Sequence, residues 1–175
     1  MAKILLYVVI CFLASSANGC NIGKRIINDF DMEKALGYWF LLYYPKEFGD
    51  KYSCYRDIYG KDDNGYTINS TIVLTSGETV VYLGTITMDD NIINIKYNTF
   101  DELSTGYRVL AADYDNYVII SGCPPGEKEV LTYMQFRSQN PDDIVMKNVE
   151  EALEQTGSKM KDYVKTTCPL QDPYR

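Results

Sequence analysis

The sequence predicts an all-β protein, an eight-stranded up-and-down antiparallel barrel with one C-terminal α-helix packed outside it. Three observations support this prediction. Short apolar segments recur along the middle of the chain and are separated by repeated turn signals. Their connections are short, as in barrels in which sequential strands are neighbours. The last periodic segment has the apolar spacing of an amphipathic helix and follows the strands.

The strands are predicted from apolar runs bounded by turn residues. The clearest hairpin signal is Asn64-Gly65, because asparagine and glycine both tolerate positive φ. Ser76-Gly77 and the acidic run 89–91 mark two further turns. The predicted strands are residues 38–44, 54–59, 66–74, 79–87, 92–97, 107–112, 117–121 and 130–136.

The C-terminal helix has its own start and stop signals. Asn140 can cap it, Pro141 fits its first turn, and Gly157 can end it. One apolar stripe can pack on the outside of the barrel. This stripe consists of Val145, Val149, Ala152 and Leu153.

Residues 1–19 are predicted to be a signal peptide. Lys3 gives the positive start, residues 4–13 form a short apolar core, and Ala17-Asn18-Gly19 is a small-residue cleavage site before Cys20. A bacterial lipoprotein signal with lipidated Cys20 is the alternative, which Asn18 fits poorly. No later apolar run is long enough for a membrane helix. We therefore expect a secreted, extracellular product without a membrane anchor, made of one domain over residues 20–175.

The chain is acidic, with a formal net charge of −7. Losing Lys3 with the leader makes the charge more negative still. Nucleic-acid binders need a basic surface to displace counterions from phosphates, so no nucleic-acid partner is expected. The acidity is explained by solubility, or by acids inside a pocket that favour a cationic ligand.

The cysteines predict two disulfides. Cys11 leaves with the leader, and an even number of cysteines in a secreted chain implies a disulfide framework. Three pairings are open to the four that remain. These four are Cys20, Cys54, Cys123 and Cys168.

Three motifs in order carry a family resemblance. They are Gly37-Tyr38-Trp39, the Asp-Tyr-x-x-Tyr run over residues 113–117, and Arg137 one strand later. This set resembles the lipocalin family. The run Asn28-Asp29-Phe30-Asp31 is similar to insect bilin-binding lipocalins, and residues 109–123 are similar to cockroach allergen lipocalins. The resemblance spans residues 28–168, and it is specific for the fold and poor for the ligand.

The resemblance implies structural roles for the motif residues. Gly37 should permit a tight entry into the first strand, and Trp39 should plug the closed end of the barrel. Arg137 should lie across that indole as a cation–π lid. Asp113 and Tyr114 should organise the adjacent turn. By the same resemblance, the disulfides of insect lipocalins imply the pairs Cys20–Cys123 and Cys54–Cys168.

One modification motif is present. Asn69-Ser70-Thr71 is an N-glycosylation sequon, so a glycoprotein is expected if the Asn69 side chain faces solvent.

No enzyme activity, metal site or cofactor is predicted. The chain has no histidine, which removes the commonest general base and metal ligand, and its cysteines are expected to be paired. The absence of histidine also argues against haem held as in nitrophorins, whereas a bilin remains a candidate ligand. Asp62-Asp63 and Asp89-Asp90 fit turns better than metal sites.

The barrel interior is the predicted ligand site. Alternation from Trp39 puts Leu41 and Tyr43 inward. An amine ligand would need an inward acid, for which Asp57 and Glu102 are candidates. Other tyrosines could line the interior or pave the outside of the strands, and their registers are open. These candidates are Tyr55, Tyr107, Tyr117 and Tyr133.

Two functions follow from the resemblance. The first is a secreted lipocalin that binds and transports a small hydrophobic or amphipathic ligand, such as an aromatic amine, bilin, pheromone or lipid. The alternative is a salivary-type interaction protein that inhibits host haemostasis by binding a protease or scavenging an agonist. The resemblance to cockroach proteins is also compatible with an allergen. The oligomeric state is open.

Overall fold

The computed structural model describes residues 25–46, 52–99, 101, 104–123, 130–166 and 168. The predicted leader, its cleavage site and Cys20 therefore lie outside the described residues. The strands are β1 (Gly37–Pro45), β2 (Tyr52–Asp62), β3 (Gly65–Leu74), β4 (Thr79–Asp89), β5 (Ile92–Tyr97), β6 (Thr105–Asp113), β7 (Tyr117–Gly122), β8 (Leu131–Phe136) and β9 (Tyr163–Lys165). The helices are α1 (Met32–Ala35), α2 (Asp143–Thr156) and a 3-10 turn (Met160–Asp162).

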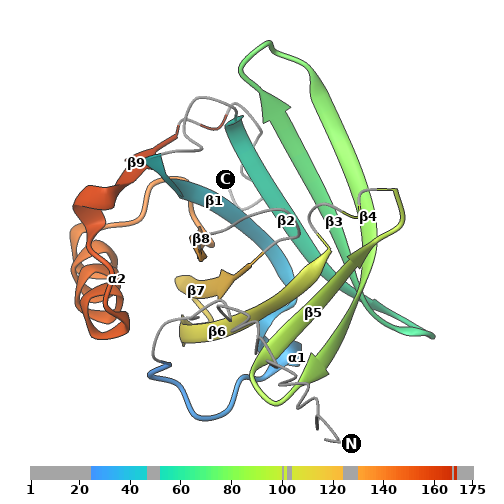
Figure 1. The fold of residues 1–175 in the computed structure, drawn as a ribbon, viewed down its shortest axis with the longest axis horizontal. Helices are drawn as coiled ribbons and strands as arrows, with labels where there is room; N and C mark the ends of the chain where they lie inside the picture. Colours follow the sequence, from blue (N-terminus) through green and yellow to red (C-terminus); the bar gives the residue numbers. More distant parts are fainter. Residues whose placement is uncertain are drawn as a thin grey trace, which may run out of the picture.

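Strands β1 to β8 form a closed antiparallel barrel, as predicted. Each strand pairs with the next one in sequence, and β1 pairs with both β8 and β2, which closes the sheet. Helix α2 lies outside the barrel on the side of β7 and β8, and β3 and β4 form the opposite wall (Figure 1). The short strand β9 was not predicted, and it extends the sheet by pairing with the end of β1.

Two apolar clusters lie on the two faces of the sheet. The first lies inside the barrel and includes Trp39, Tyr59, Ile68 and Tyr107. The second lies between the barrel and α2. It contains Phe40, Leu42, Tyr117, Ile119, Met134, Phe136, Val149, Ala152 and Leu153. The predicted stripe of α2 thus packs on the outside of the barrel.

The start of α2 differs from the prediction. Asp142 is the N-cap, and its carboxylate accepts a hydrogen bond from the Val145 amide at 2.8 Å. The predicted cap, Asn140, lies in the preceding turn, where its amide donates to Ser138 Oγ. Gly157 ends the helix in the left-handed conformation, φ 94°, as its position predicted. None of the helices in the described ranges is long and apolar enough to cross a bilayer.

One predicted disulfide is confirmed. Cys54 at the start of β2 is bonded to Cys168, which follows β9. The bond joins residues 114 apart in sequence, and closing a loop of that length is worth about 4–5 kcal/mol in a chain-entropy model. Cys123 is also disulfide-bonded. Its predicted partner, Cys20, lies outside the described residues.

One end of the barrel is plugged by Trp39. The indole is fully buried, and its Nε1 donates a hydrogen bond to the Ala35 carbonyl at 2.7 Å. The Arg137 guanidinium lies 3.7 Å from the indole centroid. The same guanidinium donates to three carbonyl oxygens at 2.9–3.1 Å, which belong to Tyr114, Tyr38 and Lys34. Arg137 therefore joins the indole plug to the strand and loop ends around it.

The turn around residue 113, beside this plug, is stabilised by hydrogen bonds within it. The Asp113 carboxylate accepts hydrogen bonds from the Asn116 side chain and the Asp115 amide. The Tyr114 hydroxyl accepts one from the Asp31 amide at 2.7 Å, which holds the N-cap of α1. Gly37 has φ 101°, a left-handed conformation that favours glycine where the chain enters β1.

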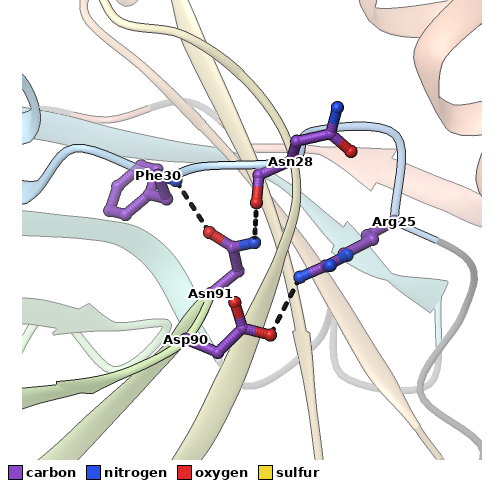
Figure 2. Close-up of polar contacts among 5 residues, drawn as sticks. All are labelled: Arg25, Asn28, Phe30, Asp90 and Asn91. Carbon is purple, nitrogen blue, oxygen red and sulfur yellow. Dashed lines mark hydrogen bonds and ion pairs between the residues drawn. The ribbon is translucent and has the colours of Figure 1, made fainter.

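The segment before α1 crosses the same end of the barrel and is held by Asn91 (Figure 2). The Asn91 side chain is buried. It accepts a hydrogen bond from the Phe30 amide at 2.7 Å and donates one to the Asn28 carbonyl. Arg25 adds an exposed ion pair with Asp90 at 3.0 Å. Asn91 thus supplies the buried polar link between this segment and the β4–β5 turn.

Replacing Asn91 with alanine is expected to lower the free energy of unfolding by about 2–3 kcal/mol. The change deletes two hydrogen bonds of a buried side chain and leaves the partly buried Phe30 amide and Asn28 carbonyl without these partners. Urea unfolding followed by circular dichroism measures this loss of unfolding free energy. Asn98→Ala, at an exposed asparagine, should stay within about 0.5 kcal/mol of wild type. Equal effects of both variants would show that the link contributes nothing specific.

Candidate ligand-binding site

Strand β2 brings a carboxylate into the barrel. Alternate residues of a strand face the same side, so Tyr55, Asp57 and Tyr59 share the inner face. Asp57 is only 4% exposed. The acid thus lies among aromatic side chains within the barrel.

Two neighbours hold the Asp57 carboxylate. Ser70 Oγ of β3 donates to Oδ1 at 2.5 Å, and Gln135 Nε2 of β8 donates to Oδ2 at 2.7 Å. The Tyr59 hydroxyl then donates to Gln135 Oε1 at 3.0 Å. Asp57 therefore joins three strands of the barrel through side-chain hydrogen bonds.

A second set of hydroxyls continues from Ser70. Tyr97 of β5 lies 2.7 Å from Ser70, oxygen to oxygen. Tyr55 lies 3.2 Å from Tyr97, again between hydroxyl oxygens. Six side chains from four strands thus form one hydrogen-bonded network with the carboxylate in its middle.

Burial dominates the electrostatics of Asp57. It raises the pKa of the carboxyl from 3.8 to about 7, although the hydrogen bonds from Ser70 and Gln135 act in the opposite direction. The ion pairs found in the described ranges join exposed groups elsewhere, and none of them includes Asp57. Within that part of the chain, the carboxylate is held by neutral donors alone.

Tyrosines dominate the aromatic surface around this acid. Tyr82 meets Tyr97 edge-on with ring centroids 6.1 Å apart, and Tyr107 meets Tyr133 in the same way at 5.8 Å. Burial raises the pKa of the Tyr55, Tyr59, Tyr97 and Tyr107 hydroxyls, so these phenols stay neutral. The interior therefore combines aromatic faces, neutral hydroxyls and one carboxyl group.

The candidate ligand residues divide between the two faces of the sheet. Leu41 pairs with Gln135 on the inner face, and Tyr55, Tyr107 and Tyr133 also face the interior. Tyr117 lies in the cluster under α2, outside the barrel. Of the two acids considered for an amine, Asp57 faces inward, and Glu102 lies outside the described residues.

The inward orientation predicted for Tyr43 is wrong. A β-bulge between Leu41 and Tyr43 adds one residue to β1, which reverses the alternation beyond it. Tyr43 pairs with Met134 and packs on Phe136, with its hydroxyl 3.9 Å from Met146 Sδ of α2. Tyr43 therefore contributes to helix packing and not to the barrel interior.

Four members of the network were not singled out from the sequence: Tyr59, Ser70, Tyr97 and Gln135. Tyr59 could have been found from strand alternation, because it lies two residues from Asp57 and therefore on the same face of β2. Ser70 and Gln135 required the cross-strand registers, which place Ser70 opposite Asp57 and Gln135 opposite Leu41.

The acidic turns hold no metal cluster. Within the described ranges, no group of three or more histidine, cysteine or acidic residues is arranged to hold a metal ion. The Asp62 carboxylate accepts a hydrogen bond from the Asn64 amide, which stabilises the β2–β3 turn. Turn chemistry therefore accounts for Asp62 in this structure.

Asp57→Asn should change how stability depends on pH. In the folded protein the Asp57 pKa is about 7, whereas its ordinary value is 3.8. Between about pH 4 and 7, the folded state therefore keeps a proton on Asp57 that the unfolded state has lost. Wild-type stability therefore falls as pH rises from about 4 to 7, by up to roughly 1.4 kcal/mol per unit. The variant lacks this contribution. Urea unfolding of both proteins should show the variant gaining about 4 kcal/mol relative to wild type between pH 4 and 8. A constant difference would contradict the shifted pKa.

A closed eight-stranded barrel, a tryptophan plug capped by arginine and one outer helix define the lipocalin fold, and this chain has it. It is similar to the cockroach major allergen Per a 4, with 23% identity over 85% of this chain and 94% of that one, at a TM-score of 0.73. The tryptamine complex of the amine-binding protein of Rhodnius prolixus matches with 19% identity over 88% and 91% of the two chains, at 0.71. Insecticyanin of the tobacco hornworm, Manduca sexta, matches with 19% identity over 85% of both chains, at 0.68.

These similarities establish the fold. No family model matches the chain. The matches to Per a 4 and to insecticyanin agree with the lipocalin resemblance found in the sequence. The ligand of this chain must be argued from its own interior residues.

Proposed function

We propose that this protein binds a small aromatic amine inside the barrel. The observation that carries the proposal is Asp57, a buried carboxyl group surrounded by tyrosines and held by neutral donors in the described part of the chain. An ammonium group would complete the charge balance of the ionised carboxylate. The aromatic ring of the ligand would lie against tyrosine faces.

The amine class agrees with a structural neighbour. The amine-binding protein of Rhodnius prolixus has the same fold and is known in a tryptamine complex. A bilin or a fatty acid carries carboxylates, which a buried acid disfavours. We therefore propose a binding and carrier role, and not an enzymatic one, with an aromatic amine in preference to a bilin, a lipid or a host protease.

Titration calorimetry at pH 8 with matched ligands tests the proposal. Tyramine and 4-ethylphenol share a phenol ring and a two-carbon substituent, and only tyramine carries an amine. We expect tyramine to bind at least tenfold more tightly. Equal affinities for the two ligands would show that Asp57 does not contribute to binding. If neither ligand binds and a clotting protease binds tightly, the interaction-protein alternative is favoured.

We also propose that the mature protein is secreted and begins at Cys20. The basis is the sequence pattern of residues 1–19 together with the Cys54–Cys168 disulfide, which is typical of oxidising compartments. Expression of the full chain in insect cells, followed by intact mass measurement of the medium, tests it. A retained leader, or protein confined to the cells, would contradict the assignment.

We further propose a glycan on Asn69. This residue alternates with inward Ser70, so it lies on the outer face of β3, opposite exposed Leu83 of β4 and away from α2. Asn69 itself is half-buried, and its side-chain oxygen is covered. An outward asparagine in a secreted chain is what the sequon requires. Secreted protein should lose one glycan mass on enzymatic deglycosylation, and Thr71→Ala should lack that glycan. An unmodified wild-type mass would exclude it.

A further inference from the structure

A chain of hydroxyl groups links Tyr55 to Asp57 through Tyr97 and Ser70, and the donor of each hydrogen bond in it can be assigned. Each hydroxyl carries one proton. The Ser70 proton is directed to the Asp57 carboxylate, so the contact of 2.7 Å between Tyr97 and Ser70 requires Tyr97 to donate. The Tyr97 proton is then engaged, so the contact of 3.2 Å requires Tyr55 to donate to Tyr97. With an ionised carboxylate, every proton points toward Asp57.

Protonating Asp57 on the oxygen that faces Ser70 reverses this direction. The carboxyl group then donates to Ser70, Ser70 donates to Tyr97, and Tyr97 donates to Tyr55. The added proton comes from solvent, and each hydroxyl keeps its own proton and only rotates about its C–O bond. Because Tyr55 now accepts from Tyr97, its own proton is free to point into the barrel.

We propose that Tyr55 is a specificity-determining residue whose hydroxyl offers a ligand an acceptor when Asp57 is ionised and a donor when Asp57 is protonated. This inference rests on the proposed function, because it concerns the second polar contact of the same bound amine. Tyr55 is placed for this role because it ends the hydroxyl chain and is only half-buried. On β2 it is nearer than Asp57 to the β1–β2 connection, at the end of the barrel opposite the Trp39 plug.

The branch through Gln135 supplies an internal control. Its amide nitrogen can only donate, so Gln135 donates to Asp57 in both states. The Tyr59 hydroxyl likewise donates to Gln135 Oε1 in both states. Protonation should therefore reorient the Tyr55 and Tyr97 hydroxyls and leave that of Tyr59 unchanged.

The surroundings favour Asp57 as the group that titrates near neutrality. The facing titratable side chains are phenols, and burial raises the pKa of the Tyr55, Tyr59, Tyr97 and Tyr107 hydroxyls. The Arg137 guanidinium stacks on Trp39 and acts on Tyr59. The inner-facing neighbours that do not titrate are Trp39 and Leu41 of β1, Ser70 of β3 and Gln135 of β8. The facing phenols are Tyr55 and Tyr59 of β2, Tyr82 of β4, Tyr97 of β5, Tyr107 of β6 and Tyr133 of β8.

The test uses ligand-free protein labelled with ¹³C at the tyrosine Cζ and aspartate Cγ atoms. Between pH 5 and 9, we expect the Tyr55 and Tyr97 resonances to shift with the same midpoint as the Asp57 carboxyl resonance. Ser70→Ala should keep the Asp57 titration and abolish the response of both tyrosines. Tyr59→Phe, on the other branch, should leave that response intact. Tyrosines that do not respond in wild type, or that still follow Asp57 in Ser70→Ala, would overturn the hydroxyl chain.

A ligand pair tests selection by Tyr55. Tyramine differs from phenethylamine by one ring hydroxyl, which can donate to the Tyr55 oxygen at pH 8. We expect wild type to prefer tyramine about fivefold, the value of one hydrogen bond, and Tyr55→Phe to remove the preference. A preference absent from wild type, or retained in the variant, would overturn selection by Tyr55. If neither amine binds, the proposed function fails, while the ligand-free titration still decides the hydroxyl chain.

Discussion

Asp57→Asn is expected to weaken tyramine binding about 100-fold at pH 8 and to leave binding of 4-ethylphenol within about threefold. Truncating one partner of a buried charge pair costs 2–5 kcal/mol, and about 1.4 kcal/mol corresponds to tenfold in affinity. Asparagine keeps the size of the side chain, removes its charge and replaces one acceptor oxygen with an NH₂ group that can donate to Ser70 Oγ. The neutral phenol has no ammonium, so it has no charge pair to lose.

The same replacement should remove the pH dependence of amine binding. In wild type the ammonium requires ionised Asp57, so affinity should fall about tenfold per pH unit below the pKa of about 7. Above that pKa, affinity should stay level until the amine itself loses its proton near pH 10, the range of a lysine ammonium. The variant should give a flat profile between pH 5 and 8.

Asp63→Asn is the matched control for this prediction. Asp63 lies exposed in the β2–β3 turn, and its replacement changes the net charge by the same amount. Tyramine affinity should be unchanged in this variant. If both variants lose affinity equally, the acidity of the whole surface and not the interior carboxyl group is attracting the amine. If neither loses affinity, the amine does not pair with Asp57.

The barrel could be predicted from sequence because its determinants are local. Each strand carries its own alternating pattern, and turn residues such as Asn64-Gly65 separate neighbouring strands. Trp39 and Arg137 were recognised as a pair only through the family resemblance, since 98 positions separate them in the chain. Their contact then appeared with the indole and guanidinium stacked.

The interior network could not be predicted because it depends on registers between strands. The sequence named Asp57 as a candidate inward acid without fixing its register, and its donors come from β3 and β8, which reach it only after the barrel closes. The error at Tyr43 has the same origin. The bulge after Leu41 follows from the packing of β1 against β8, and one extra residue is enough to turn a predicted lining residue toward α2.

Trp39→Ala is expected to lower the free energy of unfolding by about 3–5 kcal/mol, which is a large share of the 5–15 kcal/mol typical of a domain. The indole is fully buried, donates a hydrogen bond to Ala35 and covers the guanidinium of Arg137. Its removal leaves a cavity, an unsatisfied carbonyl and an arginine without its aromatic partner. Because this is the only tryptophan of the chain, urea unfolding must be followed by far-ultraviolet circular dichroism and not by tryptophan fluorescence.

Trp39→Phe separates the contributions at this plug. Phenylalanine keeps an aromatic face for Arg137 and most of the apolar volume, and it removes the hydrogen bond to Ala35. We expect a loss of about 1–2 kcal/mol, the value of one buried hydrogen bond and a small cavity. If alanine costs no more than phenylalanine, packing at the closed end contributes little, and the hydrogen bond holds α1.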